Sequence, residues 1–129
     1  CGLSERVKFI GQVSEEELLN CYQASNAFVW NADENQSWGM AGLEAMAVGK
    51  PIIVSRANGL AEVLEDEKTA LLVSPRSPEA IADAVKRLMI DPLLASSVGN
   101  NGQKLVREKY SWTTHAKEML ALFQEAIGS

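Results

Sequence analysis

The 129-residue sequence has little cysteine, little histidine and a shortage of positive charge. Two cysteines and one histidine are too few for a disulfide scaffold or for a clustered His/Cys metal site. Lysine and arginine number 12 against 17 aspartates and glutamates, which leaves a formal net charge of −5. Because nucleic-acid backbones are bound by clustered basic side chains, this balance argues against nucleic acid as a partner.

Long apolar runs are missing as well. No stretch approaches the roughly 20 residues that a transmembrane helix needs, and no basic head followed by an apolar block marks a signal peptide. The hydrophobic fraction of 47% is nevertheless sufficient for a core, and the length predicts one domain rather than two.

Apolar segments and turn residues alternate in an order typical of a β/α fold. Strands are predicted at residues 7–10, 27–30, 51–54 and 69–73. The predicted helices lie between Ser14 and Ser25, at 39–48, at 78–90, from 91 to before a Gly/Asn cluster at 99–102, at 103–110 and after Ser111. This order predicts an α/β fold: a Rossmann-like, three-layer parallel sheet with helices on both faces and a helical C-terminal tail.

The stretch 36–49 carries the strongest functional signal, because it joins two predicted strands through a polar glycine loop and a helix. In a parallel sheet such a loop lies at the carboxyl edge, where ligands bind. The first helical turn offers unpaired N–H groups and a positive dipole end that suit a phosphate. Glu44 follows in an otherwise apolar helix. The pattern leaves open whether its carboxylate binds a ribose diol or faces solvent beside Lys50.

Three loops, at 11–14, 31–39 and 55–59, are predicted to meet at that edge. Their polar residues suit binding better than catalysis, because there is neither a Ser/His/Asp set nor a Walker motif. The acidic pair Asp33 and Glu34 reads as a solvated loop, so no metal site is predicted.

The ordered motifs are similar to those of a known family. The central one reads Gln36-x-Trp38-Gly39-Met40-x-x-x-Glu44-Ala45-Met46-Ala47-x-Gly49-x-Pro51-Ile52-Ile53. It resembles the E-x7-E region of retaining GT-B glycosyltransferases, which include many bacterial polysaccharide and lipopolysaccharide enzymes. Segments 7–14, 58–64, 69–73 and 110–112 agree with the same family in order, so the resemblance spans essentially the whole chain.

The resemblance implies that residues 1–129 are part of a C-terminal donor-binding domain. The parent enzyme would transfer a hexosyl group from a nucleotide diphosphate sugar to a glycan, lipid or other acceptor, with retention and without a metal or other cofactor. By the same resemblance Glu44 would bind the ribose of the nucleotide. The donor sugar and diphosphate would contact Gln36, Trp38, Gly39, Met40 and Ala41, and accessory contacts are expected from Ser14, Arg56, Asn58 and Gly59.

This sequence departs from the family pattern in two ways. Gln36 stands where the family has a glutamate, so an acceptor oxygen is kept but the negative charge is lost. The family's N-terminal acceptor domain, the first two strands of the C-terminal domain and the basic residues after them have no counterpart in residues 1–129. We therefore expect the isolated chain to be inactive, and its unpaired strand edges predict a homo-oligomer or strand-swapped dimer.

The expected compartment is the cytoplasm, with the full-length enzyme either free or peripheral at the inner membrane face. One alternative is a non-catalytic α/β assembly or interaction module with a relict sugar-nucleotide site. A flavodoxin-like or receiver domain would also fit the β/α alternation. That class needs an acidic pocket at the end of the first strand, which Gly11-Gln12-Val13 does not supply.

Overall fold

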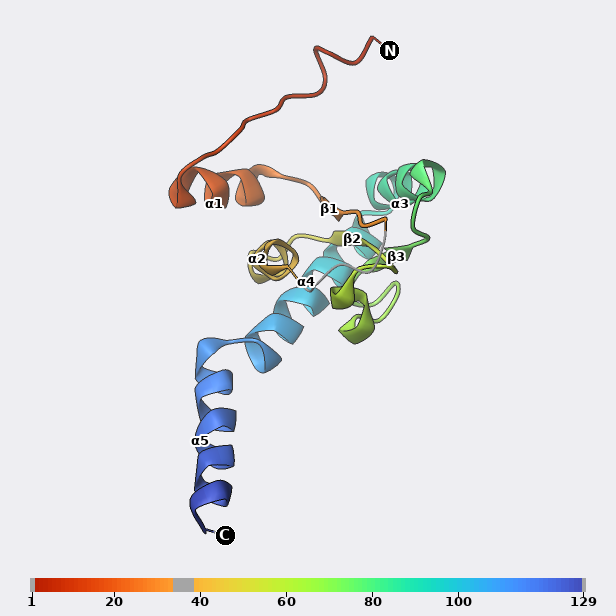
Figure 1. The fold of residues 1–129 in the computed structure, drawn as a ribbon. Coiled ribbons are helices and arrows are strands. Elements are labelled where there is room, and N and C mark those ends of the chain that lie inside the picture. The colour runs from red at the N-terminus through yellow and green to blue at the C-terminus, as the bar shows by residue number, and fades with distance from the viewer. Residues whose placement is uncertain (1, 34–38, 129) are drawn as a thin grey trace.

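The structure, a computed structural model, describes residues 2–33 and 39–128. Its elements are, in chain order, α1 (Glu15–Ala24), β1 (Phe28–Trp30), α2 (Met40–Ala47), β2 (Ile52–Ser55), the 3-10 helix η1 (Gly59–Val63), β3 (Leu71–Val73), α3 (Pro78–Ile90), α4 (Pro92–Lys109) and α5 (Trp112–Gly128). The described strands form one parallel sheet in the order β1-β2-β3 (Figure 1).

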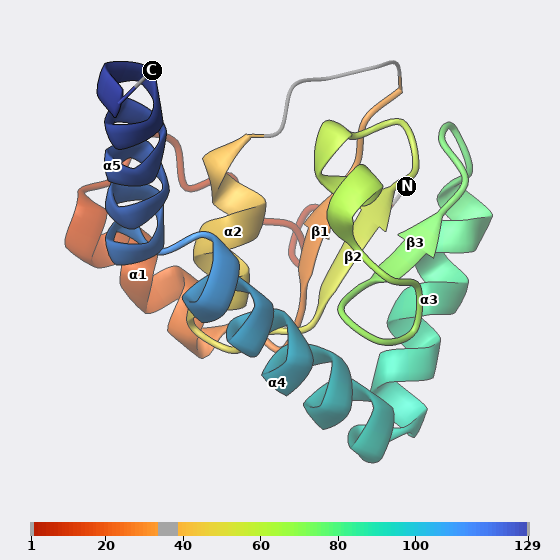
Figure 2. The same cartoon turned by 90° about the horizontal axis from the view of Figure 1, so that it is seen from below.

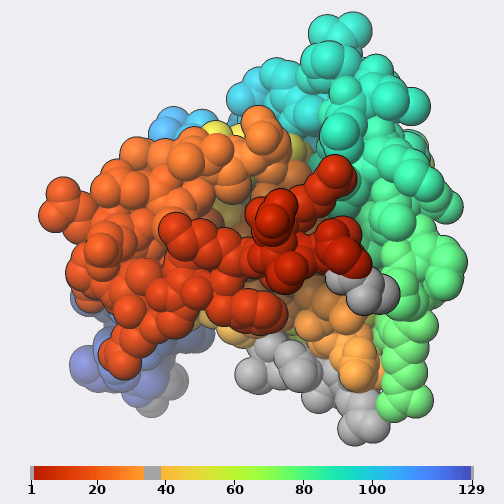
Figure 3. All heavy atoms as spheres, turned by 90° about the horizontal axis from the view of Figure 1, so that it is seen from above, coloured from red at the N-terminus to blue at the C-terminus, as the bar shows by residue number. Residues whose placement is uncertain are grey.

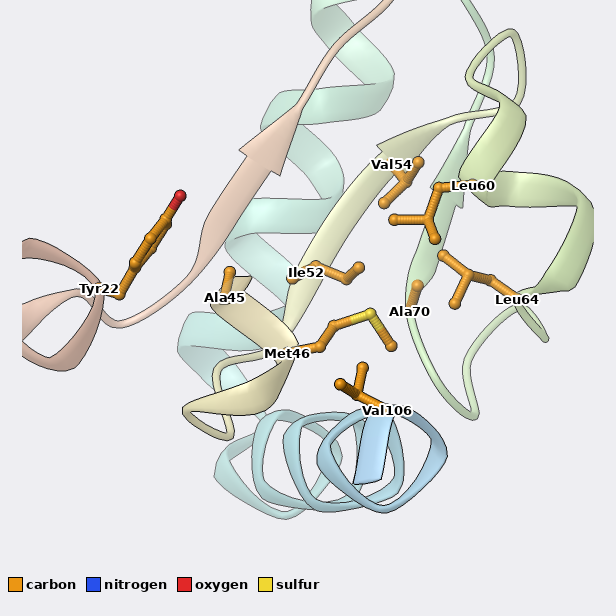
Figure 4. Close-up of a cluster of buried hydrophobic side chains, with 9 residues drawn as sticks. All are labelled: Tyr22, Ala45, Met46, Ile52, Val54, Leu60, Leu64, Ala70 and Val106. Carbon is orange, nitrogen blue, oxygen red and sulfur yellow. The ribbon is translucent and has the colours of Figure 1, made fainter. Parts of the chain in front are cut away.

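Strand β2 lies at the centre of this sheet, and all of its residues are buried. On one face, side chains from α2, α4 and η1 pack around Met46 and Ile52 (Figure 4). On the other face, Ile53 and Leu71 pack against Ala84 and Leu88 of α3. An apolar strand covered on both sides is typical of parallel sheets. The prediction of a parallel α/β sheet with helices on both faces is confirmed.

Capping side chains set the starts of three helices at positions that the sequence indicates. Ser14 Oγ accepts a hydrogen bond from the N–H of Glu17, while the N–H of Ser14 donates to Glu17 Oε2 at 2.9 Å. Hydrogen bonds from the Ser14 backbone and side chain hold the pKa of Glu17 below its usual value. Ser77 and Asp91 cap α3 and α4 in the same way, each followed by proline in the first turn.

The strand predicted at 7–10 is wrong. These residues form no strand, and Phe9 is 94% exposed. The N-terminal segment runs apart from the sheet in Figure 1 and lies in front of the body in the view of Figure 3. The local sequence has the alternation of a strand, but a strand also needs a neighbour to pair its backbone groups. None of the described strands lies beside it.

The helix break predicted at 99–102 is also wrong, because α4 runs without interruption through this cluster. Its glycines permit close packing instead. A Cβ at Gly99 would lie 2.4 Å from the carbonyl oxygen of Gly49. A Cβ at Gly102 would lie 3.2 Å from both Met46 Cε and the Thr69 carbonyl oxygen. The absence of side chains here lets α4 approach the end of α2, and that contact compensates for the low helix propensity of glycine.

Helix α5 continues from α4 and projects from the body (Figure 1), and its described residues are all at least partly exposed. It forms the predicted helical tail, but apolar side chains on it, including Phe123 and Ile127, are exposed and belong to neither core cluster. Within the described residues, no helix combines the length and the apolarity that crossing a bilayer requires.

The close approach of α4 gives a direct test of the fold. Gly99→Ala should lower the free energy of unfolding by about 2 kcal/mol or more, because the added methyl meets backbone rather than a movable side chain. Asn100→Ala, at an exposed position of the same helix, is the matched control and should change stability by only a few tenths of a kcal/mol. Urea unfolding measures both values, and equal stabilities for the two variants would contradict this packing.

Candidate functional site

The N-terminus of α2 lies at the carboxyl edge of the sheet, at the same end as the tips of β2 and β3 (Figure 2). The chain enters this helix through Gly39, whose φ of +58° is a conformation that L side chains rarely adopt. A Cβ at Gly39 would lie 2.5 Å from Cζ2 of Trp30. Glycine is therefore required both by the turn and by the indole ring that packs against it.

Two loops at this edge are joined by a buried hydrogen bond. Ser55, the last residue of β2, donates from Oγ to the carbonyl oxygen of Ala32, which follows β1, over 2.8 Å. Among the described residues no side chain caps the start of α2, and Met40 is 64% exposed. The backbone N–H groups of Met40 and Ala41 thus stand at a positively polarised helix end that no described side chain caps.

Glu44 lies one helical turn further along α2, about 6 Å along the helix axis from Met40. Its side chain is exposed, and its Oε2 accepts a hydrogen bond from Oη of Tyr22 at 3.0 Å. Both residues line an open hollow of about 460 Å³ between α1 and α2. The other lining side chains are mostly apolar and include one further carboxylate: Glu15, Leu18, Leu19, Ala47 and Val48. This hollow offers acceptors and apolar contact but no cation.

Tyr22 is buried, with 8% of its surface exposed, and its ring packs edge-on against Phe28 with 5.7 Å between centroids. Burial raises the pKa of Tyr22 to about 12, and the hydrogen bond to Glu44 and the charge of that carboxylate act in the same direction. The phenol therefore stays protonated, and remains a donor to Glu44, at any ordinary working pH.

Several residues expected to give accessory contacts have structural partners. Ser14 caps α1. Asn58 is buried and caps η1, because its Oδ1 accepts from the N–H of Leu60, the residue after Gly59. Arg56 is exposed and forms an ion pair with Asp66. Asp66 in turn accepts from the N–H of Leu72, so Arg56 is held at the edge of β3.

Gly39 directly precedes α2, and Met40, Ala41 and Glu44 lie in its first two turns. Arg56, Asn58 and Gly59 follow β2 at the same edge, whereas Ser14 follows no described strand. Gln36 and Trp38 lie outside the described residues. In the described part of the chain, no three His, Cys, Asp or Glu side chains are arranged to hold a metal ion.

Tyr22 is the member of the site that sequence reasoning missed. Its place on the apolar face of α1 predicts only a core residue. A signal was present, however, since a buried tyrosine hydroxyl normally finds a hydrogen-bond partner. The identity of that partner depends on how α1 crosses α2, which helical periodicity does not give.

These features define a class of protein: a parallel α/β domain that has, at its ligand-binding edge, a helix N-terminus that no described side chain caps and a carboxylate one turn further along the helix. Comparison with known families identifies the family within this class. The family model described as "Glycosyl transferases group 1" matches residues 1–105, and the chain belongs to this family.

Individual relatives agree with this assignment. An uncharacterized glycosyltransferase, MJ1607 of Methanocaldococcus jannaschii, is 34% identical over 126 residues, which are 98% of this chain and 32% of that protein. Sucrose-phosphate synthase from Thermosynechococcus elongatus is 35% identical, with a TM-score of 0.86 over 98% of this chain and 31% of that one.

Anabaena Alr3699/HepE, solved in complex with UDP-glucose, has a TM-score of 0.87 at 21% identity, over 96% of this chain and 34% of that one, which shows a shared fold. The chain thus spans about a third of the length of these proteins.

The raised pKa of Tyr22 predicts a pH dependence of stability. Unfolded tyrosine ionises near pH 10 and folded Tyr22 near 12, so the unfolded state releases its proton first. The stabilising contribution should be complete below pH 10 and should be lost as the pH rises toward 12. Urea unfolding on both sides of pH 10 measures the loss. Tyr22→Phe should make the free energy of unfolding depend less on pH in this range. Burial also raises the pKa of Tyr110, but Tyr110 is present in both proteins and therefore does not cause a difference between them. The same slope in both would contradict the assignment.

Proposed function

We propose that this chain is the donor-binding part of a glycosyltransferase that uses a nucleotide diphosphate sugar. In this proposal Glu44 accepts hydrogen bonds from the ribose hydroxyls. The N–H groups at the start of α2, from Gly39 to Ala41, hold sugar or diphosphate oxygens. The observation that carries the proposal is the placement of both groups on one helix, one turn apart, with the start of that helix at the carboxyl edge of the sheet (Figure 2).

The chemistry of each position supports its assignment. The first turn of α2 has no side-chain cap among the described residues, so its N–H groups are available to an anion. The hollow beside Glu44 is lined by apolar groups and by carboxylates, which suits sugar hydroxyls and repels phosphate. A nucleotide would therefore place its diphosphate at the helix end and its ribose beside Glu44.

The family and the fold support the choice of ligand. The chain is a group 1 glycosyltransferase domain, and HepE, which shares its fold, was solved with UDP-glucose. The full protein would transfer a hexosyl group to a glycan, lipid or other acceptor with retention of configuration and without a metal, working in the cytoplasm or at the inner membrane face. Gln36 and Trp38 would contact the donor sugar, and the acceptor would be bound by a further N-terminal domain.

Nucleotide binding tests the role of Glu44. Glu44→Ala should weaken binding of uridine or guanosine diphosphate about tenfold or more in isothermal titration calorimetry of the full-length protein. A hydrogen bond to a charged group contributes roughly 1.5–3 kcal/mol, and each ~1.4 kcal/mol is a factor of ten in affinity. Binding that is unchanged by the substitution would remove Glu44 from the site.

Glu108→Ala is the matched control. Glu108 is an exposed carboxylate on α4 that forms a surface ion pair with Lys104 over 3.9 Å. Such a pair contributes little to stability, so this variant should bind nucleotide as the unaltered protein does. Failure of the unaltered protein to bind either nucleotide would favour the non-catalytic assembly module instead.

A further inference from the structure

The Glu44 carboxylate is held before any ligand arrives. Among the described residues its one protein hydrogen bond comes from Oη of Tyr22, which donates to Oε2 over 3.0 Å. An exposed glutamate normally samples several rotamers, and a ligand that fixes them loses affinity in doing so. A hydrogen bond already made to one carboxylate oxygen restricts this freedom in the empty protein.

Tyr22 is itself anchored by groups outside the hollow. The residue is 8% exposed, and its ring packs edge-on against Phe28 of β1, at one end of the core cluster (Figure 4). Its backbone carbonyl accepts a hydrogen bond from Ser25 Oγ at 2.8 Å, where α1 ends. Packing against the sheet and the hydrogen bond at the end of α1 therefore restrict the position of the hydroxyl.

The geometry leaves the rest of the carboxylate available. Tyr22 engages Oε2, and Oε1 has no protein partner in the described part of the chain. Both side chains line the same hollow, so a ligand that enters it meets an oriented acceptor. A carboxylate has about four lone-pair sites, so two hydroxyl donors can still bind after one site is taken.

We propose that Tyr22 is a positioning residue for recognition of the nucleotide diol: its hydroxyl holds the Glu44 carboxylate in the orientation that accepts both ribose hydroxyls. This inference rests on the proposed function and adds to it a residue on a different element. It also explains why a tyrosine, rather than a phenylalanine, fills this place on the apolar face of α1. The raised pKa of Tyr22 keeps the donor proton in place over the whole working pH range.

The competing explanation is structural. The Tyr22 hydroxyl could use Glu44 only to satisfy its own hydrogen-bonding need, with no consequence for a ligand. Tyr22→Phe separates the two explanations, because it keeps the ring that packs against Phe28 and removes only the donor. The readout has to report on the diol itself, since general destabilisation would affect every nucleotide alike.

The experiment is a mutant cycle in the full-length protein, read by calorimetry with two probes. One probe is uridine or guanosine diphosphate, whichever the unaltered protein binds more tightly, and the other is its 2′,3′-dideoxy form. Tyr22→Phe should weaken binding of the natural nucleotide about three- to tenfold and leave the dideoxy affinity within about twofold, as expected for loss of one oriented hydrogen bond. In the Glu44→Ala background the tyrosine substitution should have no further effect. In turnover assays, donor KM should rise while kcat stays unchanged.

Each other outcome has a definite meaning. Equal weakening of both probes by Tyr22→Phe would assign Tyr22 a structural role and overturn the inference. So would natural-nucleotide binding that Glu44→Ala weakens but Tyr22→Phe does not. If Glu44→Ala leaves the preference for the natural over the dideoxy nucleotide intact, the proposed role of Glu44 fails together with the inference on Tyr22. In the first two outcomes only the inference on Tyr22 fails. Glu44→Gln replaces the alanine variant if the latter proves unfolded.

Discussion

The close approach of α4 to α2 is the constraint on which the rest of the structure depends. Gly99 of α4 lies against the carbonyl oxygen of Gly49, just beyond α2, and Gly102 lies against Met46 within it. Met46 is fully buried between the two helices and contributes to the core over the sheet. Because packed interiors tolerate little change in volume, this contact fixes how far α2 stands from β2. The position of α2 in turn places its N-terminus and Glu44.

A second close contact sets the other side of α2. A Cβ at Gly42 would lie 2.6 Å from Leu60 Cδ2, so η1 presses against the helix at its middle. Leu60 is held by the Asn58 cap, which follows the buried end of β2. The binding helix is thus seated between α4 and η1, while its remaining flank faces Tyr22. A site built in this way on packed elements keeps its geometry better than one built on loops alone.

The sequence predicts features that are decided locally. The caps at Ser14, Ser77 and Asp91 follow from short-range chemistry, and the strands around 28–30, 52–55 and 71–73 follow from apolar runs between turn residues. The errors occur where a segment distant in the sequence determines the local structure. Residues 7–10 have the pattern of a strand but no partner, and the glycines of α4 look like a break until the backbone of Gly49 is seen beside them. The Tyr22–Glu44 contact was missed for the same reason, because two residues that are 22 positions apart, on different helices, have to meet to form it.

Charge shows what this arrangement can and cannot do for a nucleotide diphosphate. The start of α2 offers the equivalent of about half a positive charge, whereas a diphosphate carries several times that amount of negative charge. Arg56 stands at the same edge, but Asp66 already pairs with it and is tied in turn to the backbone of β3. Recruiting Arg56 would therefore break an existing network. In the proposed function the described site would therefore orient a nucleotide, through the helix N–H groups and an aligned carboxylate, better than it would neutralise it.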